Sequence, residues 1–309
     1  MYRKICRRLL YFIPVLIGIS FISFCLIYLA PGDPAEVRLT AAGVNPSASA
    51  LADMRVKMGL DRPFFMQYFN WLSAVLRGDM GRSYANDMKV MDIILGALPS
   101  TLVMAASAMI ITICISIPLG IYTALQRGKT VDAVIGCISF TGIALPNFIV
   151  GIALLYIFSY RLKLIPILNS GGIKGMILPA CTLAITMSSK YIRQIRAAAV
   201  DELSKPYISG LRSRGISEFD ILFKNVLKNI MVMLITITGI SIGSLLGGTV
   251  VVESIFNRPG IGTKMLSAIG ARDYPLIQGL VLWITLVFML VNLITDISYT
   301  WFNPKIRNI

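Results

Sequence analysis

The sequence contains no histidine. Histidine is the commonest transition-metal ligand and the usual general base, so its absence removes both. The five cysteines show no C-x-x-C spacing, which argues against a zinc site and against a disulfide framework. No serine elbow, paired catalytic carboxylates or H-E-x-x-H pattern occurs. We therefore expect a chain that is not an enzyme, with no catalytic residue, no metal site and no cofactor of its own.

Charged residues are also scarce. They make up 14% of the 309 residues, while 56% are hydrophobic and the mean hydropathy is +0.76. A soluble domain has about 25% charged residues, so the excess apolar surface must face lipid. The net charge of +14 could favour nucleic acid, but the basic residues lie in the connections between apolar stretches. Membrane orientation explains them, and we expect no nucleic-acid partner.

Apolar stretches predict an all-α polytopic membrane protein with six transmembrane helices. The first stretch resembles a signal peptide, but Pro31 is a poor cleavage position and the length suits a retained span. Six spans put both ends on one side, and the basic short loops place the N- and C-termini in the cytoplasm. The expected spans cover about residues 9–30, 98–125, 133–160, 176–190, 230–252 and 280–301.

The predicted organisation has three parts. Residues 1–30 form the cytoplasmic N-terminus and first span, residues 31–95 form an extracytoplasmic helical subdomain, and residues 96–309 form a transmembrane core. In 31–95 we expect two short amphipathic helices on either side of "GLDRP", with Pro63 at a helix start and aromatic side chains at the membrane interface.

A possible nucleotide motif fails on spacing. "RGKT" (127–130) is similar to the end of a P-loop, but the position five residues before Gly128 is Thr123 rather than glycine. We therefore expect that this chain does not hydrolyse ATP.

A stripe of small residues marks the fifth span. Gly239, Gly243 and Gly247 are four apart, a spacing that lets another helix approach closely, either within the chain or from a partner subunit. The nearby hydroxyls of Ser241, Ser244 and Thr249 could line a polar path or bond back to their own helix. Glu253, at the end of this span, is either a solvated helix end or a contact for a docking partner.

The segment "KPYISGLRSRGISEFDILFKNVLKN" (205–229), within a cytoplasmic loop at about 197–229, is too polar to span and too long for a simple connection. Pro206 can start a helix and Gly215 suits a helix end. A stripe of apolar residues then predicts an amphipathic helix that returns to the membrane. A protein partner would explain both halves of the segment. The stripe comprises Phe219, Leu222, Phe223, Val226, Leu227 and Ile230.

This loop resembles the E-A-A-x-x-x-G loop of membrane subunits of ATP-binding-cassette (ABC) importers. Gly215 aligns with the signature glycine, and Ser209, Gly210 and Leu211 occupy the E-A-A positions, so the signature glutamate is absent. "LAPGDP", "MGLDRPFFMQYFNWL", "GDMGRSY", "IPLGI", "VVVESIFNRPGIG", "RDYPLIQG" and "NPKIR" are similar, in this order, to landmarks of the dipeptide/oligopeptide/nickel permease group.

The resemblance implies a fold and a set of partners. It implies the type I importer transmembrane fold in a multi-pass protein of the bacterial inner membrane, surrounded by lipid. The partners would be a second homologous permease, two ABC ATPase subunits that hold ATP-Mg, and an extracytoplasmic binding protein. "LPNF" (145–148) and "IGSLLGGTVVVESIF" (242–256) look closest to nickel-type subunits, so nickel or a metal chelate is the expected cargo. A dipeptide or oligopeptide cargo is the alternative, and a passive channel or carrier is the alternative class.

The resemblance also assigns site residues. ATPase coupling would use Lys205, Pro206, Tyr207, Ser209, Gly210, Leu211, Arg212, Arg214 and Gly215. The cations among them would meet acidic groups on the ATPase, or else merely follow the positive-inside rule. The translocation path or subunit packing would use Pro146, Asn147, Gly239, Ser241, Gly243, Ser244, Gly247 and Thr249. Binding-protein docking would use Glu253 and Arg258.

Overall fold

The computed structural model describes residues 2–41, 46–166, 172 and 174–302. Among these residues it is helical apart from turns and one isolated bridge between Arg82 and Lys89, which confirms the all-α class. The chain divides into two compact units, Met1–Thr101 with Pro259–Leu290, and Leu102–Arg258 with Val291–Ile309. We call them the first and second units. Helices α5 (Val90–Leu125) and α13 (Tyr274–Phe302) contribute residues to both. The three-part division predicted from the sequence stays a prediction.

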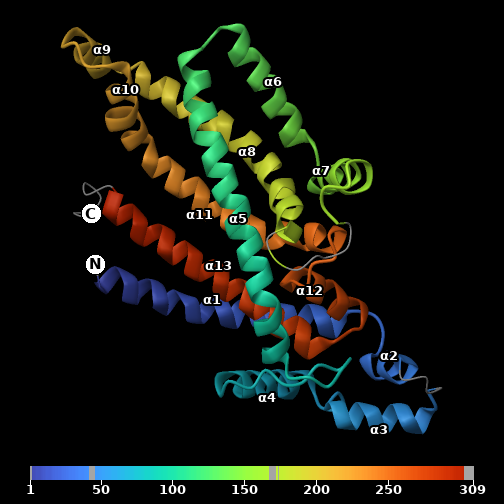
Figure 1. Cartoon of the computed structure of the whole chain (residues 1–309). Helices are drawn as coiled ribbons and strands as arrows, with labels where there is room; N and C mark the ends of the chain where they lie inside the picture. Colours follow the sequence, from blue (N-terminus) through green and yellow to red (C-terminus); the bar gives the residue numbers. More distant parts are fainter. Residues whose placement is uncertain (1, 42–45, 167–171, 173, 303–309) are drawn as a thin grey trace. The chain divides into compact units, whose positions relative to one another are not determined.

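The first unit combines the long helix α1 with shorter helices and with parts of α5 and α13 (Figure 1). Its core beside α5 and α13 includes Val90, Ile94 and Leu280, none of which has exposed surface. The helices that belong to this unit alone are α1 (Tyr2–Leu29), α2 (Pro34–Ala41), α3 (Ala48–Met58), α4 (Phe64–Leu76) and α12 (Ile261–Gly270).

The two amphipathic helices expected around "GLDRP" are α3 and α4. Gly59 ends α3 with a φ of 68°, a left-handed conformation that glycine adopts without strain, and Pro63 lies at the N-cap of α4. Phe64 packs edge-on against Tyr28 of α1, with ring centroids 5.0 Å apart, whereas Phe65 keeps 62% of its surface exposed. The aromatic side chains of α4 therefore include one that packs against α1 and one that is exposed. Their place at the membrane interface stays a prediction.

The second unit is organised around α8 (Lys174–Leu203), which contacts α6, α7 and α11. Its side chains Tyr191, Ile195 and Ala199 are almost fully buried in the main core of the unit. The other elements of this unit are α6 (Thr130–Ala144), α7 (Asn147–Leu154), the π-helix η1 (Leu155–Arg161), α9 (Pro206–Ser213), α10 (Glu218–Asp220), the π-helix η2 (Ile221–Val226) and α11 (Leu227–Ile255).

The predicted single span 133–160 is instead a broken pair. α6 ends at Ala144, α7 begins at Asn147, and the two axes differ by 103°. Pro146 has no N–H to continue the helix and it disfavours the helical conformation at Leu145, which is extended at φ −79° and ψ 122°. A continuous helix over residues 133–160 was therefore not the right expectation.

Within the residues that the structure describes, four helices are long and apolar enough to cross a membrane: Arg8–Leu29, Val90–Leu125, Glu218–Leu245 and Tyr274–Ser298. A fifth crossing results if the broken pair forms one span. The C-terminal half of α8 carries Lys190, Arg193 and Arg196, and α8 does not qualify by composition. The six-span count and the cytoplasmic position of both termini therefore stay predictions.

An ion pair joins α6 to α8. Arg196 Nε and Nη2 donate to the two carboxylate oxygens of Asp132 at 2.5 and 2.6 Å, and the backbone N–H of Gly128 donates to the same carboxylate at 3.0 Å. Farther along, Gly142 allows α6 to approach Ser189 closely, because a Cβ on this glycine would collide with the serine side chain. The two helices are thus held by a polar clamp at one end and by backbone proximity at the other.

Replacing Arg196 by Gln should leave the Asp132 carboxylate, whose side chain is 10% exposed, with the Gly128 N–H as its remaining hydrogen-bond donor among the described residues. Because charge-assisted hydrogen bonds contribute more than neutral ones, we expect a loss on the order of 1–3 kcal/mol, near the lower end since Arg196 is partly exposed. Thermal unfolding of the purified protein measures it. The double variant Asp132→Asn/Arg196→Gln should lose less than the sum of the single losses, and Lys190→Gln, an exposed cation on the same helix, serves as the control. Additive losses would show that the pair has no coupling.

Candidate functional site

The segment singled out in the sequence forms a short helix with defined ends. α9 starts at Pro206, in the first helical position, and stops at Ser213. Gly215 follows at φ 77°, its N–H donates to Arg212 O at 2.9 Å, and Ile216 N–H donates to Leu211 O at 3.2 Å. These two bonds form a Schellman motif, which requires a left-handed residue at the glycine position. The predicted break at Gly215 is confirmed.

One face of α9 is fixed to the second unit. Ile208 has no exposed surface and packs in the main core, and Leu211 and Ile216 pack partly buried against the same core. The opposite face is exposed and small, with Ser209 and Gly210 at its centre. Figure 1 shows α9 at the tip where α8 and α10 meet. One face of α9 is therefore fixed to the core of the second unit, and the opposite face is exposed and accessible to a partner.

A buried carboxylate ties this helix to its neighbours. Glu202, in the last turn of α8, is only 6% exposed. It accepts hydrogen bonds from Lys205 Nζ at 2.6 Å, Tyr207 Oη at 2.7 Å and Asn229 Nδ2 at 2.8 Å. Asn229 Nδ2 also contacts Tyr207 Oη at 3.1 Å. The Glu202 network thus connects the ends of α8, α9 and α11 through one side chain.

The network also determines the charge state of Glu202. Burial raises the pKa of the carboxyl, but the hydrogen bonds from Lys205, Tyr207 and Asn229 outweigh it, so the pKa lies below its ordinary value. The group is therefore charged at neutral pH. Glu202 and Asn229 were not among the predicted site residues, because they pair across a long stretch of sequence. The available signal was the position of Glu202 three residues before Lys205, a spacing at which an acid and a base on a helix can pair.

The three basic residues proposed for coupling differ in their availability. Lys205 binds Glu202, and Arg212 forms a bidentate pair with Glu218 at 2.6 and 3.2 Å. Arg214 is exposed and has no ion pair within the described part of the chain. A surface pair such as Arg212–Glu218 contributes about 0–1 kcal/mol, so a partner can replace it.

The apolar stripe after Gly215 divides into two faces. Leu222, Val226 and Ile230 are buried at a spacing of four, as predicted. Phe219 and Phe223 are exposed by 67% and 53%, with ring centroids 4.4 Å apart. The predicted amphipathic helix is present, and its apolar stripe has a buried part and an exposed part. The chain adopts the π-helix η2 here, whose wider turn separates the two sets.

The small residues of α11 (Leu227–Ile255) also have two different surroundings. A Cβ on Gly239 would lie 2.5 Å from Thr295 of α13, so this glycine serves packing within the chain. At Gly247 a Cβ would meet nothing within 4 Å, and this part of the stripe is open. Gly243 is half-buried.

The hydroxyl groups proposed for a path are engaged or buried. Ser244 Oγ donates to Ser241 O at 2.9 Å, which is bonding within the helix, and the side chains of Ser241 and Thr249 are buried. Their role in a translocation path stays a prediction.

A hydrogen bond from α8 holds the break between α6 and α7 in place. Asn147 Oδ1 accepts a hydrogen bond from Thr186 Oγ1 of α8 at 2.7 Å, while Pro146 is exposed. A structural role for Asn147 is thus clear, and its place in a path stays a prediction.

The two residues predicted for binding-protein docking are buried in the single chain. Glu253 has no exposed surface and Arg258 is 9% exposed, with its backbone N–H donating to Glu253 O at 2.8 Å. Glu253 is therefore not a solvated helix end, which corrects one of the two readings. Docking through these residues stays a prediction. Among the described residues no group of three or more His, Cys, Asp or Glu is arranged to hold a metal ion.

The apolar helices and the anchored, exposed helix α9 agree with the resemblance to the membrane subunits of ABC importers. Comparison with solved structures agrees: the permease of the MetNI methionine ABC transporter, in an inward-facing form, superposes with a TM-score of 0.57 at 16% identity, over 69% of this chain and 97% of that one. This likeness establishes the type I ABC importer fold.

The particular family follows from the sequence. Residues 116–308 match the family described as binding-protein-dependent transport system inner membrane component, and residues 1–105 match its N-terminal membrane family. The chain is 36% identical to the glutathione transport system permease protein GsiC of Salmonella choleraesuis, and 34% identical to GsiC of Escherichia coli K12, each over 99% of both chains. The chain belongs to this family of ABC importer permeases.

Membership confirms several expectations. The chain is a multi-pass protein of the bacterial inner membrane and a transport subunit without an ATPase site. The family works with a second permease, ATPase subunits and a binding protein.

The Schellman motif predicts a graded series at Gly215. Space is available for a Cβ, so Gly215→Ala should suffer only from the positive φ, by about 1 kcal/mol, and Gly215→Asn by less. Gly215→Pro can neither adopt φ 77° nor donate to Arg212 O, so it should abolish transport and uncouple ATP hydrolysis. Transport per ATP in the reconstituted complex measures the series, with Gly136→Ala in α6 as control. Normal transport by an assembled Gly215→Pro complex would refute the coupling role.

The Glu202 network predicts a second coupling defect. Glu202→Gln keeps the shape but leaves Lys205 without its carboxylate, so we expect transport per ATP to fall several-fold while ATP hydrolysis persists. Asp201→Asn, an exposed neighbouring acid, should behave as wild type. Because the pKa of Glu202 is depressed, its stabilising contribution is present at neutral pH and disappears as the pH falls through that lowered value. Equal coupling in the Glu202→Gln and wild-type complexes would contradict the prediction.

Proposed function

We propose that this chain forms, with a second permease, the translocation path for a short peptide of the glutathione type. The relatives at 34–36% identity over 99% of the chain are glutathione transport permeases, and this supports a peptide over the nickel cargo favoured by short motifs. A binding protein would deliver the peptide at the outer face. Two ATPases, which hold ATP-Mg, would supply the energy.

The observation that carries the proposal is the exposed face of α9. Ser209 and Gly210 present little side chain, so a partner surface can approach the helix backbone, and Arg214 offers a guanidinium to an acidic group on the ATPase. Five further residues would keep the helix in its docking orientation: Lys205, Pro206, Tyr207, Leu211 and Arg212.

Force on α9 would reach the membrane through α8. The Glu202 network joins the base of α9 to α8, and the Asp132–Arg196 pair joins α8 to α6. These links would make the second unit follow α9 as one body when the ATPases close. Rocking of such a body against the second permease would alternate access to the two sides of the membrane.

Reconstitution with the second permease, both ATPases and the binding protein in liposomes tests the cargo. We expect ATP-dependent accumulation of radiolabelled glutathione and no accumulation of ⁶³Ni²⁺ at the same concentration. Accumulation of nickel alone would replace the peptide proposal by the nickel one.

The same liposomes without ATPases test the competing class. Uptake that equilibrates glutathione without ATPases or ATP would identify a passive channel or carrier. A binding-protein variant that cannot hold peptide provides the control for leakage.

A further inference from the structure

A pocket of about 210 Å³ lies within the first unit, between α1, α3, α4 and the start of α13. We call it the Arg62 pocket. Its walls come from the subdomain predicted to be extracytoplasmic and from the helix ends beside it. None of its lining residues was assigned a role by the sequence analysis.

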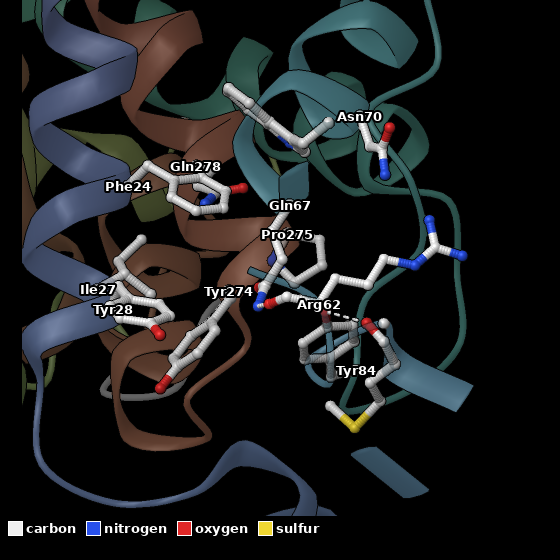
Figure 2. Close-up of a pocket in the computed structure, with 13 residues that line it drawn as sticks. Phe24, Ile27, Tyr28, Arg62, Gln67, Asn70, Tyr84, Tyr274, Pro275 and Gln278 are labelled. Atoms are coloured by element: carbon white, nitrogen blue, oxygen red, sulfur yellow. Dashed lines mark hydrogen bonds between the residues drawn. The ribbon is translucent and has the colours of Figure 1, made fainter. Parts of the chain in front are cut away.

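The pocket has an aromatic side and a polar side. Figure 2 shows the rings of Phe24, Tyr28 and Tyr274 on one side of the view, and the side chains of Arg62 and Asn70 on the other. Neither Arg62 nor Asn70 has an ion pair or a side-chain hydrogen bond within the described part of the chain. The described lining residues include this arginine and no aspartate or glutamate. The charge of the pocket therefore suits an anion.

Gln278 offers a second polar group to a ligand. This residue is 5% exposed and lines the pocket, and its carboxamide makes no hydrogen bond to any described residue. A ligand with peptide N–H or C=O groups would pair with this amide.

The hydroxyl of Tyr84 supports the same electrostatic picture. Burial, with the nearby Asp273 and Tyr274, raises the pKa of Tyr84 to about 12, so the phenol stays neutral. The loop that carries it is fixed by Asp273, which accepts hydrogen bonds from the Ser83 hydroxyl and from the Tyr84 N–H at 2.9 Å. The wall is thus preformed and adds no negative charge.

Size limits the ligand. A cavity of roughly 150 Å³ can accept a benzene ring, whereas drug-sized ligands occupy roughly 300 Å³ or more. The Arg62 pocket at about 210 Å³ lies between these and fits one amino-acid residue.

We infer that the Arg62 pocket binds the carboxyl-terminal residue of a short peptide, with its carboxylate at Arg62 and Asn70. The rings would surround the Cα of that residue, which is glycine in glutathione, or an apolar side chain where the peptide has one. This inference deepens the proposed function and rests on its peptide cargo. The site would receive one end of the peptide on the outer face, before the peptide enters the path. Arg62 sets the requirement for a free carboxylate, and Gln278 contacts the peptide backbone.

Photolabelling of the assembled permease–ATPase complex in nanodiscs, without binding protein, tests the site directly. The probe is Ala-Ala-photoleucine with a free carboxylate, whose diazirine side chain is small enough for the pocket. We expect mass spectrometry to find the label on α1 or α4 residues of the pocket. Ala-Ala-Leu should compete with it, and Ala-Ala-Leu amide should compete at least tenfold less well.

Two variants and one control separate binding from folding. Arg62→Gln should weaken labelling at least tenfold and erase the preference for the acid, and Gln278→Leu should weaken it several-fold while keeping that preference. Arg77→Gln, an exposed arginine outside the pocket, should label as wild type. Thermal unfolding and basal ATP hydrolysis confirm that each complex is intact.

The outcomes distinguish this inference from the cargo proposal. Labelling elsewhere, equal competition by acid and amide, or unchanged labelling of Arg62→Gln would overturn the inference, even where liposomes accumulate glutathione. Loss of binding-protein affinity in Arg62→Gln without any peptide label would mean that the pocket docks a protein side chain, and would also overturn it. The expected labelling in a complex that takes up no peptide would leave the outer site standing and refute the proposed cargo.

Discussion

The Glu202 carboxylate imposes the constraint on which the candidate site depends. A charge with 6% of its residue exposed must be paired, because an uncompensated buried charge is far more costly than a broken surface pair. Its partners come from α9 and α11, so the pairing is possible only when the ends of three helices meet in one arrangement. If any one of these partners is removed, the Glu202 carboxylate loses a hydrogen bond at a place that little water reaches. The position of α9 is therefore specified by electrostatics as well as by the burial of Ile208.

This constraint matters because of what α8 connects. Within lipid there is little hydrophobic force between helices, and close contact depends on small residues and on polar pairs. α8 uses both: Gly142 and Gly120 let α6 and α5 approach it, and Asp132 holds Arg196. A Cβ on Gly120 would lie 2.7 Å from Ile195, so these helices cannot slide past one another without a collision. A displacement at Glu202 is more easily transmitted along such a packed group than absorbed within it.

What the sequence predicts well is local. Pro206 and Gly215 set the ends of α9 through backbone rules that need no neighbour, and Gly59 and Pro63 do the same for α3 and α4. The failures involve distance or direction. Asn229 meets Glu202 across 27 positions, a contact that no periodicity encodes. The bend of 103° at Pro146 and the π-helix η2 are departures from a regular helix whose direction and width hydrophobic periodicity does not specify. Periodicity with a fixed period of 3.6 could not foresee the exposure of Phe219 once that period changed.

The loop lacks the glutamate of the E-A-A-x-x-x-G signature, and a different acid takes part in its structure. Ser209 stands at its position on the exposed face, so the carboxylate of the signature is not available to a partner. Here the acid of the loop, Glu202, lies instead on the inner side, where it orients α9 through Tyr207 and Lys205. In the proposed coupling, recognition of an ATPase would then depend on the shape of α9 and on the outward cation of Arg214. In this proposal, the carboxylate of Glu202 positions α9 from the inside, and the exposed backbone at Ser209 and Gly210 contacts the partner. The two roles therefore belong to different residues.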